Sequence, residues 1–241
     1  ETCWSTIDPA AVPYAGYDAP DVGATLQRGH RDGSVWRPGE TDVSIRPGWF
    51  WHPAENNKVR SADDILTLYF TSVGRNSKLL LNVPPTPDGL LHETDVARLV
   101  EFGSNRAALF SNDLARGARV RASNTTGSTA TARNVVDGDA NTWWSAAAGA
   151  TSATLEIELP RPTTCSVLRL QEPIAGGQTI ESFAVDAISP SGPVRLASGT
   201  TIGYCRLVRL PPTPVHRLRV TLESALGDVR LASFGMFSDA R

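Results

Sequence analysis

Residues 61–85, SADDILTLYFTSVGRNSKLLLNVPP, decide how the first half of this sequence folds. Ser61 is a good helix N-cap, and the carboxylates of Asp63 and Asp64 suit the positive end of a helix dipole. An apolar stripe at helical spacing follows, formed by Ile65, Leu66, Leu68, Tyr69 and Val73. Gly74 is expected to end the helix.

The segments around this helix read as strands and a second helix. The run KLLLNV (78–83) predicts a strand buried on both faces, as in a parallel sheet, and DVSIRPGWF (42–50) predicts another strand. Residues 86–110 predict a turn followed by an amphipathic helix, whose core side carries Val96, Leu99, Val100 and Phe102. This alternation is typical of an α/β barrel or a doubly wound sheet. Two convincing strands are few for a parallel sheet, so we expect the end of a larger domain.

The pattern changes after about residue 113. Seven short segments alternate in polarity and are separated by Pro, Gly, Ser and Asp: 153–160, 165–173, 181–190, 194–199, 206–212, 216–224 and 229–237. This spacing is typical of an antiparallel β-sandwich. We therefore expect two domains, residues 1–113 and 114–241.

Composition restricts the classes of partner. The 241 residues carry a formal charge of -2 and no basic cluster, which argues against nucleic acid. No apolar run approaches the roughly 20 residues of a membrane-spanning helix. The cysteines are not spaced as metal ligands, although Cys165 and Cys205 are a candidate disulfide pair. The chain opens on ETCWSTID without a signal peptide, so we expect an earlier natural start.

Several of these motifs together resemble glycoside hydrolase family 29, the α-L-fucosidases. The resemblance covers roughly residues 1–112, through ETCWSTID (1–8), SIRPGWFWHP (44–53) and SVGRNSKLLLNVPPTPDGLL (72–91). It implies the C-terminal part of a (β/α)8 TIM-like barrel. The length of the insert before GWFWH is more similar to the branch that acts on α-1,3 and α-1,4 linked fucose.

The second half resembles a coagulation factor V/VIII type C, or discoidin-like, module of jelly-roll architecture, through residues 134–146, 155–172 and 230–237. Such modules often follow the barrel in this family and bind carbohydrate. The resemblance implies a calcium site formed by Asp137, Asp139 and Thr142, although Ser233 stands where the pattern has a glutamate. It also implies a core Trp144 and leaves Trp143 as the candidate sugar platform. A tight aspartate turn explains the same segment without calcium.

A retaining fucosidase needs a carboxylate nucleophile and a carboxyl acid/base, about 5 to 5.5 Å apart. By the resemblance the nucleophile lies upstream of this sequence. Glu1 matches one assignment of the acid/base, whereas another assignment places it further upstream. Glu40 and Asp42 share a strand face, and Glu40 is a candidate substrate contact, although both are equally explained as polar groups entering a strand. Asp42 is also a candidate partner of Arg46.

SIRPGWFWHP is the expected wall of a fucose pocket. The carboxyl ends of barrel strands carry active sites, and tryptophan matches the apolar C–H faces and methyl group of fucose. We interpret Trp49 as a sugar contact, Trp51 and Phe50 as core aromatics, and His52 as structural. Arg46 is expected to orient a carboxylate.

The segment 21–38 is expected to form a loop over the same face. His30, Arg31 and Trp36 are candidate contacts to the sugar that carries fucose; an exposed loop without this role is equally consistent. Two functions stay open: a fucosidase part that is inactive without its N-terminal portion, with a fucosylated glycan as substrate, or a non-catalytic, lectin-like protein that binds carbohydrate through the sandwich. No cofactor is expected for catalysis. We expect a secreted or periplasmic bacterial protein.

Overall fold

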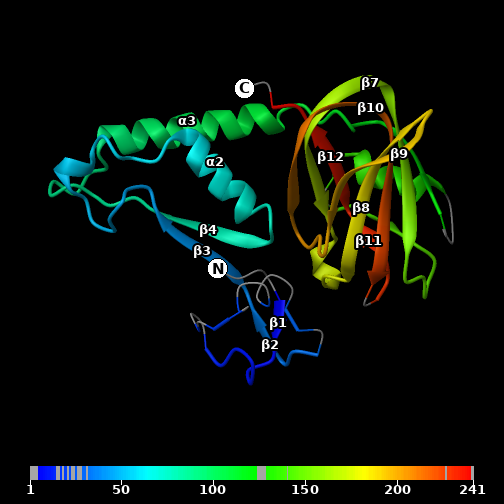
Figure 1. Cartoon of the computed structure of the whole chain (residues 1–241), viewed down its shortest axis with the longest axis horizontal. Coiled ribbons are helices and arrows are strands. Elements are labelled where there is room, and N and C mark those ends of the chain that lie inside the picture. Colours follow the sequence, from blue (N-terminus) through cyan, green and yellow to red (C-terminus); the bar gives the residue numbers. More distant parts are fainter. Residues whose placement is uncertain are drawn as a thin grey trace. The chain divides into compact units, whose positions relative to one another are not determined.

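A computed structural model describes residues 5–14, 17, 19–20, 22, 25, 29–30, 32–123, 129–139, 141–225 and 227–239 (Figure 1). The chain divides into two compact units, Glu1–Ser111 and Asn112–Arg241. This division falls two residues before the expected boundary at 113/114. None of the helices in the described ranges has the length and apolar character that a membrane crossing requires.

The first unit is built around a strand–helix–strand–helix sequence. Its strands are β1 (Ser5–Ile7), β2 (Val35–Arg37), β3 (Gly39–Ser44) and β4 (Ser77–Asn82). Its helices are η1 (Pro53–Glu55), α2 (Ala62–Thr71) and α3 (Glu93–Phe110). β1 pairs antiparallel with β2, whereas β3 pairs parallel with β4, from Gly39 opposite Ser77 to Ser44 opposite Asn82. The parallel pair with its crossover helix α2 is one βαβ unit.

Helix α2 begins where the sequence predicts. Ser61 accepts a hydrogen bond from the Asp64 backbone N–H, and the Asp64 carboxylate accepts one from the Ser61 N–H, which completes a capping box. The helix ends at Thr71, before Gly74, and the left-handed residue that follows is Asn76, with φ 65°. Gly74 as the residue that ends the helix is therefore wrong.

Two expectations about strands are wrong in the first unit. The strand expected over 42–50 is β3, which ends at Ser44 because Pro47 and Gly48 turn the chain and the Ser44 hydroxyl donates to the Gly48 carbonyl at 2.7 Å. Strand β4 is not buried on both faces, because Leu80 is 42% exposed. Within the described chain its sheet contains only β3 besides itself.

Helix α3 buries only part of the expected face, because Leu99 and Phe102 are half-buried but the two valines are not. Val96 and Val100 are exposed, whereas Asp95 and Leu109 are buried. Tyr69 of α2 packs against the rings of Phe102 and Phe110, so the helices meet through aromatic contacts. The spacing of the valines does not by itself identify the buried face of α3, because the carboxylate of Asp95 takes a core position.

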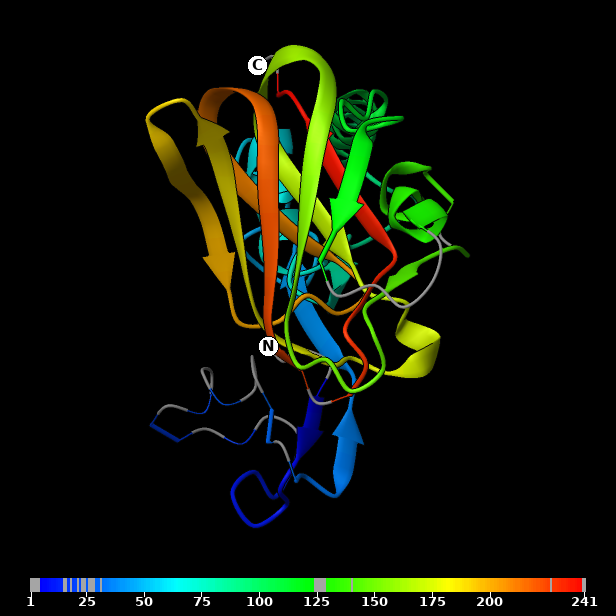
Figure 2. The same cartoon turned by 90° about the vertical axis from the view of Figure 1, so that its right-hand side faces the viewer.

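The second unit is a β-sandwich (Figure 2). Its elements in chain order are β5 (Arg119–Ala122), η2 (Thr129–Val136), β6 (Trp144–Ser145), β7 (Ala153–Gln171), η3 (Ile174–Gly176), β8 (Ile180–Ser189), β9 (Gly192–Gly199), β10 (Arg206–Ala225), β11 (Arg230–Leu231) and β12 (Ser233–Phe237). The strands run in the order β12-β7-β10-β8-β9, with β5 also beside β7 and a separate β6–β11 pair.

All seven predicted segments contain strand, but four of them fuse in pairs into the long strands β7 and β10. The segment 229–237 instead divides into β11 and β12, which pair with β6 and β7. The prolines that suggested strand ends lie instead where β7 and β10 bend. The pairing of β10 with β7 shifts register between Arg209 and Thr213 and between Val215 and Arg217. Proline is tolerated at such bulges because no ladder hydrogen bond is needed there.

The bends let each long strand contribute to two parts of the sandwich. The first half of β7 pairs with β5 and its second half with β12. Alternate residues of both halves enter one core, among them Leu155, Ile157, Leu168 and Leu170, together with the fully buried Trp144. Trp144 as a core residue is confirmed.

Candidate functional site

The segment 44–53 leaves the carboxyl end of β3 and is tied to the end of β4. The Asn82 side-chain amide donates to the Trp49 carbonyl at 2.9 Å and to the Ser44 hydroxyl at 3.1 Å. The Arg60 guanidinium donates to the Ser44 carbonyl at 2.9 Å. Because both strands of this parallel pair end at the same edge, Trp49 is presented at that edge.

Arg46 is buried and does not face the surface. Its Nε donates to the Asp95 carboxylate at 2.9 Å, and neither side chain is exposed. Its Nη1 donates to the Asn56 side-chain oxygen at 3.0 Å and to the His52 carbonyl at 3.4 Å. Arg46 does orient a carboxylate, but that carboxylate belongs to Asp95. The predicted pairing of Arg46 with Asp42 is therefore wrong, because Asp42 lies on the exposed face of β3.

The three aromatic residues of this segment lie in different environments. Trp49 is 52% exposed and Phe50 is 85% exposed. Trp51 is half-buried and stacks at a tilt on the His92 ring, with ring centroids 6.2 Å apart. A core position is thus wrong for Phe50, whereas Trp51 has the structural environment expected of it. Trp49 has the exposure that a sugar contact requires.

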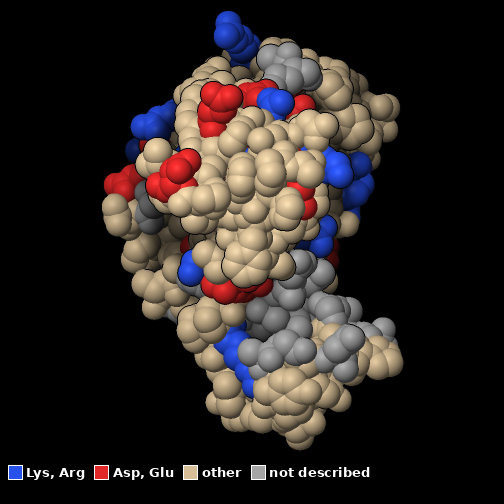
Figure 3. Space-filling view, turned by 90° about the vertical axis from the view of Figure 1, so that its left-hand side faces the viewer, with Lys and Arg blue, Asp and Glu red and all other residues tan. Residues whose placement is uncertain are grey.

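The surface around these loops has an uncharged central area, although Lys58, Arg60 and Asp88 of the same loops are exposed. Figure 3 views the side on which the connection 45–60 and the turn 83–92 lie, and its central area contains neither acidic nor basic residues. Leu90 and Leu91 are exposed in that turn, as Trp49 and Phe50 are in the connection. A surface of this kind suits an apolar or uncharged ligand.

The acidic candidates do not come together with Trp49 in a described catalytic pair. Glu40 is exposed and forms a salt bridge of 3.3 Å with Lys78, which is the neighbouring position in the parallel pairing. Glu1 lies outside the described residues.

His30 is used to hold the backbone of the first strand. Its ring Nδ1 accepts a hydrogen bond from the Asp8 backbone N–H at 3.0 Å. The backbone N–H of His30 donates to the Thr6 carbonyl at 2.8 Å. Trp36 on β2 is 58% exposed and so remains accessible to a ligand. Arg31 lies outside the described residues.

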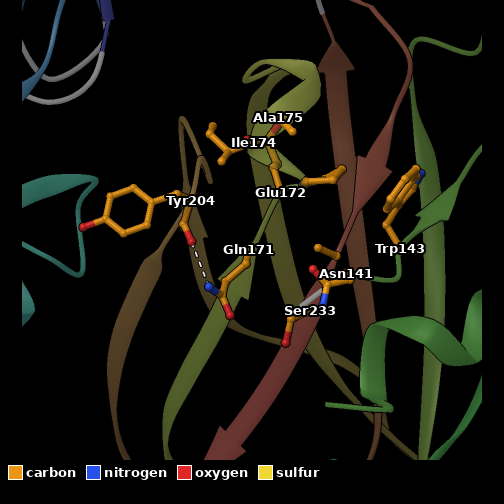
Figure 4. Close-up of a pocket in the computed structure, with 10 residues that line it drawn as sticks. Asn141, Trp143, Gln171, Glu172, Ile174, Ala175, Tyr204 and Ser233 are labelled. Carbon is orange, nitrogen blue, oxygen red and sulfur yellow. Dashed lines mark hydrogen bonds between the residues drawn. The ribbon is translucent and has the colours of Figure 1, made fainter. Parts of the chain in front are cut away.

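A pocket of about 390 Å³ opens in the second unit (Figure 4). It is lined by Asn141, Trp143, Gln171, Glu172, Pro173, Ile174, Ala175, Tyr204, Ala232 and Ser233. In Figure 4 the Trp143 ring stands at the right, Ile174 and Ala175 of the η3 turn lie at the top, and Asn141 and Ser233 lie near each other below them. Trp143 is 45% exposed, so the tryptophan predicted to be accessible is accessible. The pocket itself was not predicted, because its residues are scattered over four segments of the chain.

Glu172 organises one wall of this pocket. Its carboxylate accepts hydrogen bonds from the N–H groups of Thr179 at 2.7 Å, Ile180 at 3.0 Å and Gly203 at 2.6 Å. Burial raises the pKa of Glu172, against the opposing effect of these hydrogen bonds. Because its oxygens are engaged, the charge of Glu172 is directed at the protein's own backbone.

The predicted calcium residues form a tight turn. Asp137 accepts hydrogen bonds from the Asp139 N–H and from the Thr142 hydroxyl, both at 2.8 Å. The Asp139 carboxylate accepts from the Asn141 N–H at 2.9 Å. Calcium takes about six to eight oxygen ligands. Donors of the turn itself engage both carboxylates here, and a calcium site at Asp137, Asp139 and Thr142 stays a prediction.

Cys165 and Cys205 are not joined by a disulfide. Both thiols are buried, and burial raises the pKa of each to about 11. The proposed pair is therefore wrong, and both side chains act as small apolar core groups.

Comparisons with known proteins place these features in a family. Residues 17–105 match the model of the alpha-L-fucosidase family. Curated relatives from Arabidopsis thaliana and from rice (Oryza sativa subsp. japonica) are each 35% identical over 99% of this chain, which covers 47% and 46% of their lengths. The Arabidopsis protein is named alpha-L-fucosidase 1.

Solved structures agree over both units. The glycoside hydrolase family 29 fucosidase of Ruminococcus gnavus in complex with fucose is 32% identical with a TM-score of 0.82, covering 90% of this chain and 44% of its own. The structure named SpGH29 is 32% identical with a TM-score of 0.85, covering 99% of this chain and 51% of its own. The chain spans about half the length of the curated relatives it matches, and the family model, the relatives and the solved structures together support the alpha-L-fucosidase family, glycoside hydrolase family 29.

Proposed function

We propose that this chain is the C-terminal part of a retaining alpha-L-fucosidase that removes terminal α-1,3- or α-1,4-linked L-fucose from glycans. The observation that carries the proposal is Trp49, half-exposed at the carboxyl edge of a parallel strand pair, within the residues that match the family. The Ruminococcus gnavus relative was solved with fucose bound. The βαβ unit supports the C-terminal part of a (β/α)8 barrel, whose active site would lie at that edge.

The residues of this chain supply binding in the proposed reaction. Trp49 packs against the apolar face and methyl group of fucose, and the backbone ties through Asn82 hold the ring at the edge of the sheet. Glu40 and Trp36 are retained as candidate contacts beyond the fucose ring, and Glu1 as a candidate acid/base, with an upstream glutamate as the alternative. The nucleophile belongs to the portion that precedes this chain. Hydrolysis of the fucoside therefore needs both this chain and the portion that carries the nucleophile.

Turnover of 4-nitrophenyl α-L-fucopyranoside tests the proposal. We expect no turnover by this chain alone and turnover when the upstream portion is supplied. In the complete protein, Trp49→Ala should raise KM about tenfold, the scale of a lost aromatic contact at a binding site. Trp143→Ala is the matched control, because it removes a similarly exposed tryptophan from the other unit. Turnover by this chain alone would contradict the assignment of the nucleophile.

A second function rests on the pocket beside Trp143. An exposed aromatic ring next to neutral polar groups such as Asn141 and Gln171 suits one sugar ring, so the sandwich is a candidate discoidin-like carbohydrate-binding module. If this function stands alone, the complete protein binds fucosylated glycans without hydrolysing them. Trp143→Ala then abolishes binding to a glycan array while Trp49→Ala leaves it unchanged. Export to the periplasm or medium of a bacterium stays a prediction, which fractionation of the source cells tests.

A further inference from the structure

We infer that Arg46 and Asp95 form a buried positioning pair that fixes the loop carrying Trp49, and that neither residue contacts the sugar. This loop, residues 45–60, connects β3 to α2. The inference rests on the proposed function only for the role of Trp49; the positioning itself is a property of the fold.

The pair joins parts of the chain that are far apart in sequence. Arg46 lies just after β3 and Asp95 in the first turn of α3, 49 residues later, and their side chains are completely buried. From this anchored guanidinium, Nη1 reaches Asn56 and the His52 carbonyl. One side chain therefore ties residues 46, 52 and 56 of the loop to the first turn of α3.

A second contact acts in the same direction. The Trp51 ring packs on His92, which is the N-cap residue of α3 and accepts a hydrogen bond from the Thr94 N–H at 3.2 Å. Because Trp51 contacts His92 and the Arg46 guanidinium contacts Asp95, both ends of the backbone segment 46–51 are held at the start of α3. Asn82 and Ser44 hold its other side, so Trp49 is left as the exposed, oriented ring.

Stability alone is a poor explanation for the pair. Burying two charges carries a desolvation cost that is repaid only when all their polar atoms are satisfied. Here the Nη2 atom of Arg46 and the Oδ1 atom of Asp95 have no hydrogen-bond partner within the described part of the chain. Apolar side chains of similar volume can fill such a space at no loss of stability. They cannot hold Asn56 and the His52 carbonyl, which makes loop geometry the property that depends on charge.

The double variant Arg46→Met/Asp95→Leu separates the two roles. In the 241-residue chain we expect an unfolding midpoint equal to or above that of the parent, but amide hydrogen exchange in residues 47–56 faster on the order of tenfold, as local opening becomes easier. The matched control is Arg98→Gln/Glu101→Gln, which removes an exposed pair on the same helix. It should leave exchange in this loop unchanged. Unchanged exchange in the Arg46/Asp95 double variant would overturn the inference.

The functional half has a separate readout in the complete protein. The double variant should raise KM for the fucoside by about the same factor as Trp49→Ala, and adding Trp49→Ala to it should cause little further loss, because the two act through one contact. If the loop is loosened and KM does not change, the link to the sugar site is overturned. If Trp49→Ala itself has no effect, the proposed function fails while the exchange result still decides the positioning.

Discussion

The two units protect their apolar side chains from water to different degrees. Among the large apolar residues that the structure exposes, all but Trp143 and Val194 belong to the first unit. The second unit closes its core with its own strands, because β7 and β10 bend and pair with different neighbours in each half. In the first unit, the described residues leave β4 with one strand partner and the valines of α3 in water. An apolar pattern predicts burial only when the covering layer is present.

The largest expected difference between the units is in the unfolding free energy lost when one large aromatic side chain in each unit is replaced by alanine. Trp144→Ala should lower the free energy of unfolding of the second unit by about 3–5 kcal/mol, the usual cost of emptying a large core site. Phe50→Ala should change the free energy of unfolding of the first unit by less than about 0.5 kcal/mol, because the Phe50 side chain is already in water. Hydrogen exchange resolved by peptide during urea unfolding measures both. Similar losses in both units would remove the contrast.

The buried thiols offer a second measure of how well the sandwich is closed. With the pKa of Cys165 and Cys205 raised to about 11, the thiolate fraction at pH 8 is about 100-fold below that of an ordinary cysteine. Both should resist iodoacetamide in the folded protein and react fully in urea. Peptide mass spectrometry identifies each site. Rapid labelling in the native state would show that the second unit opens readily.

Protonation of Glu172 should make the stability of the second unit depend on pH. Since its pKa is raised in the folded state, the folded protein holds this proton to higher pH than the unfolded chain does. The proton on Glu172 therefore stabilises the second unit fully below the ordinary glutamate pKa. This stabilisation is lost as pH rises through the raised pKa of Glu172. Urea midpoints between pH 4 and 7 should fall for the parent and fall less for Glu172→Gln. The exposed Glu223→Gln is the control, and an identical slope in all three proteins would refute this role.

The smallest effect is expected at the surface of the first unit. Lys78→Ala removes the exposed salt bridge to Glu40 and should change the unfolding free energy by about 0–1 kcal/mol. Thermal denaturation at low and high salt measures it. A loss well above this range, insensitive to salt, would show that Glu40 and Lys78 are desolvated by partners beyond the described residues.

Local patterns were sufficient where one residue type answers one short-range need. The Ser61 cap, the start of α2 and the strand segments of the second unit were predictable in this way. The contrast between buried Trp144 and exposed Trp143 came from the resemblance to a discoidin-like module. Strand ends were less predictable, because Pro160 and Pro211 read as stops although they lie in continuous strands that bend. A proline shows that a donor is missing and leaves open whether the strand resumes.

The candidate sites depended more heavily on long-range contacts. Sequence spacing suggests Asp42, four residues away, as the partner of Arg46, whereas the structure shows Asp95 on helix α3. Nothing in the polar spacing around Asp95 distinguishes it from its exposed neighbours, since a charge on an amphipathic helix is normally solvated. Glu172 was missed for a related reason, because its three N–H donors come from loops that meet only after folding.

The sequence by itself determined the two-part organisation, the alternation of strands and helices, and the aromatic segment that carries Trp49. These features follow from periodicity, caps and turns, which act over a few residues. Only the tertiary structure decided that Arg46 turns inward, that Phe50 faces water, that the two cysteines remain thiols, and that Trp143 borders a pocket. Burial and ion pairing depend on which distant segments fill the surrounding space, and no local pattern specifies those neighbours.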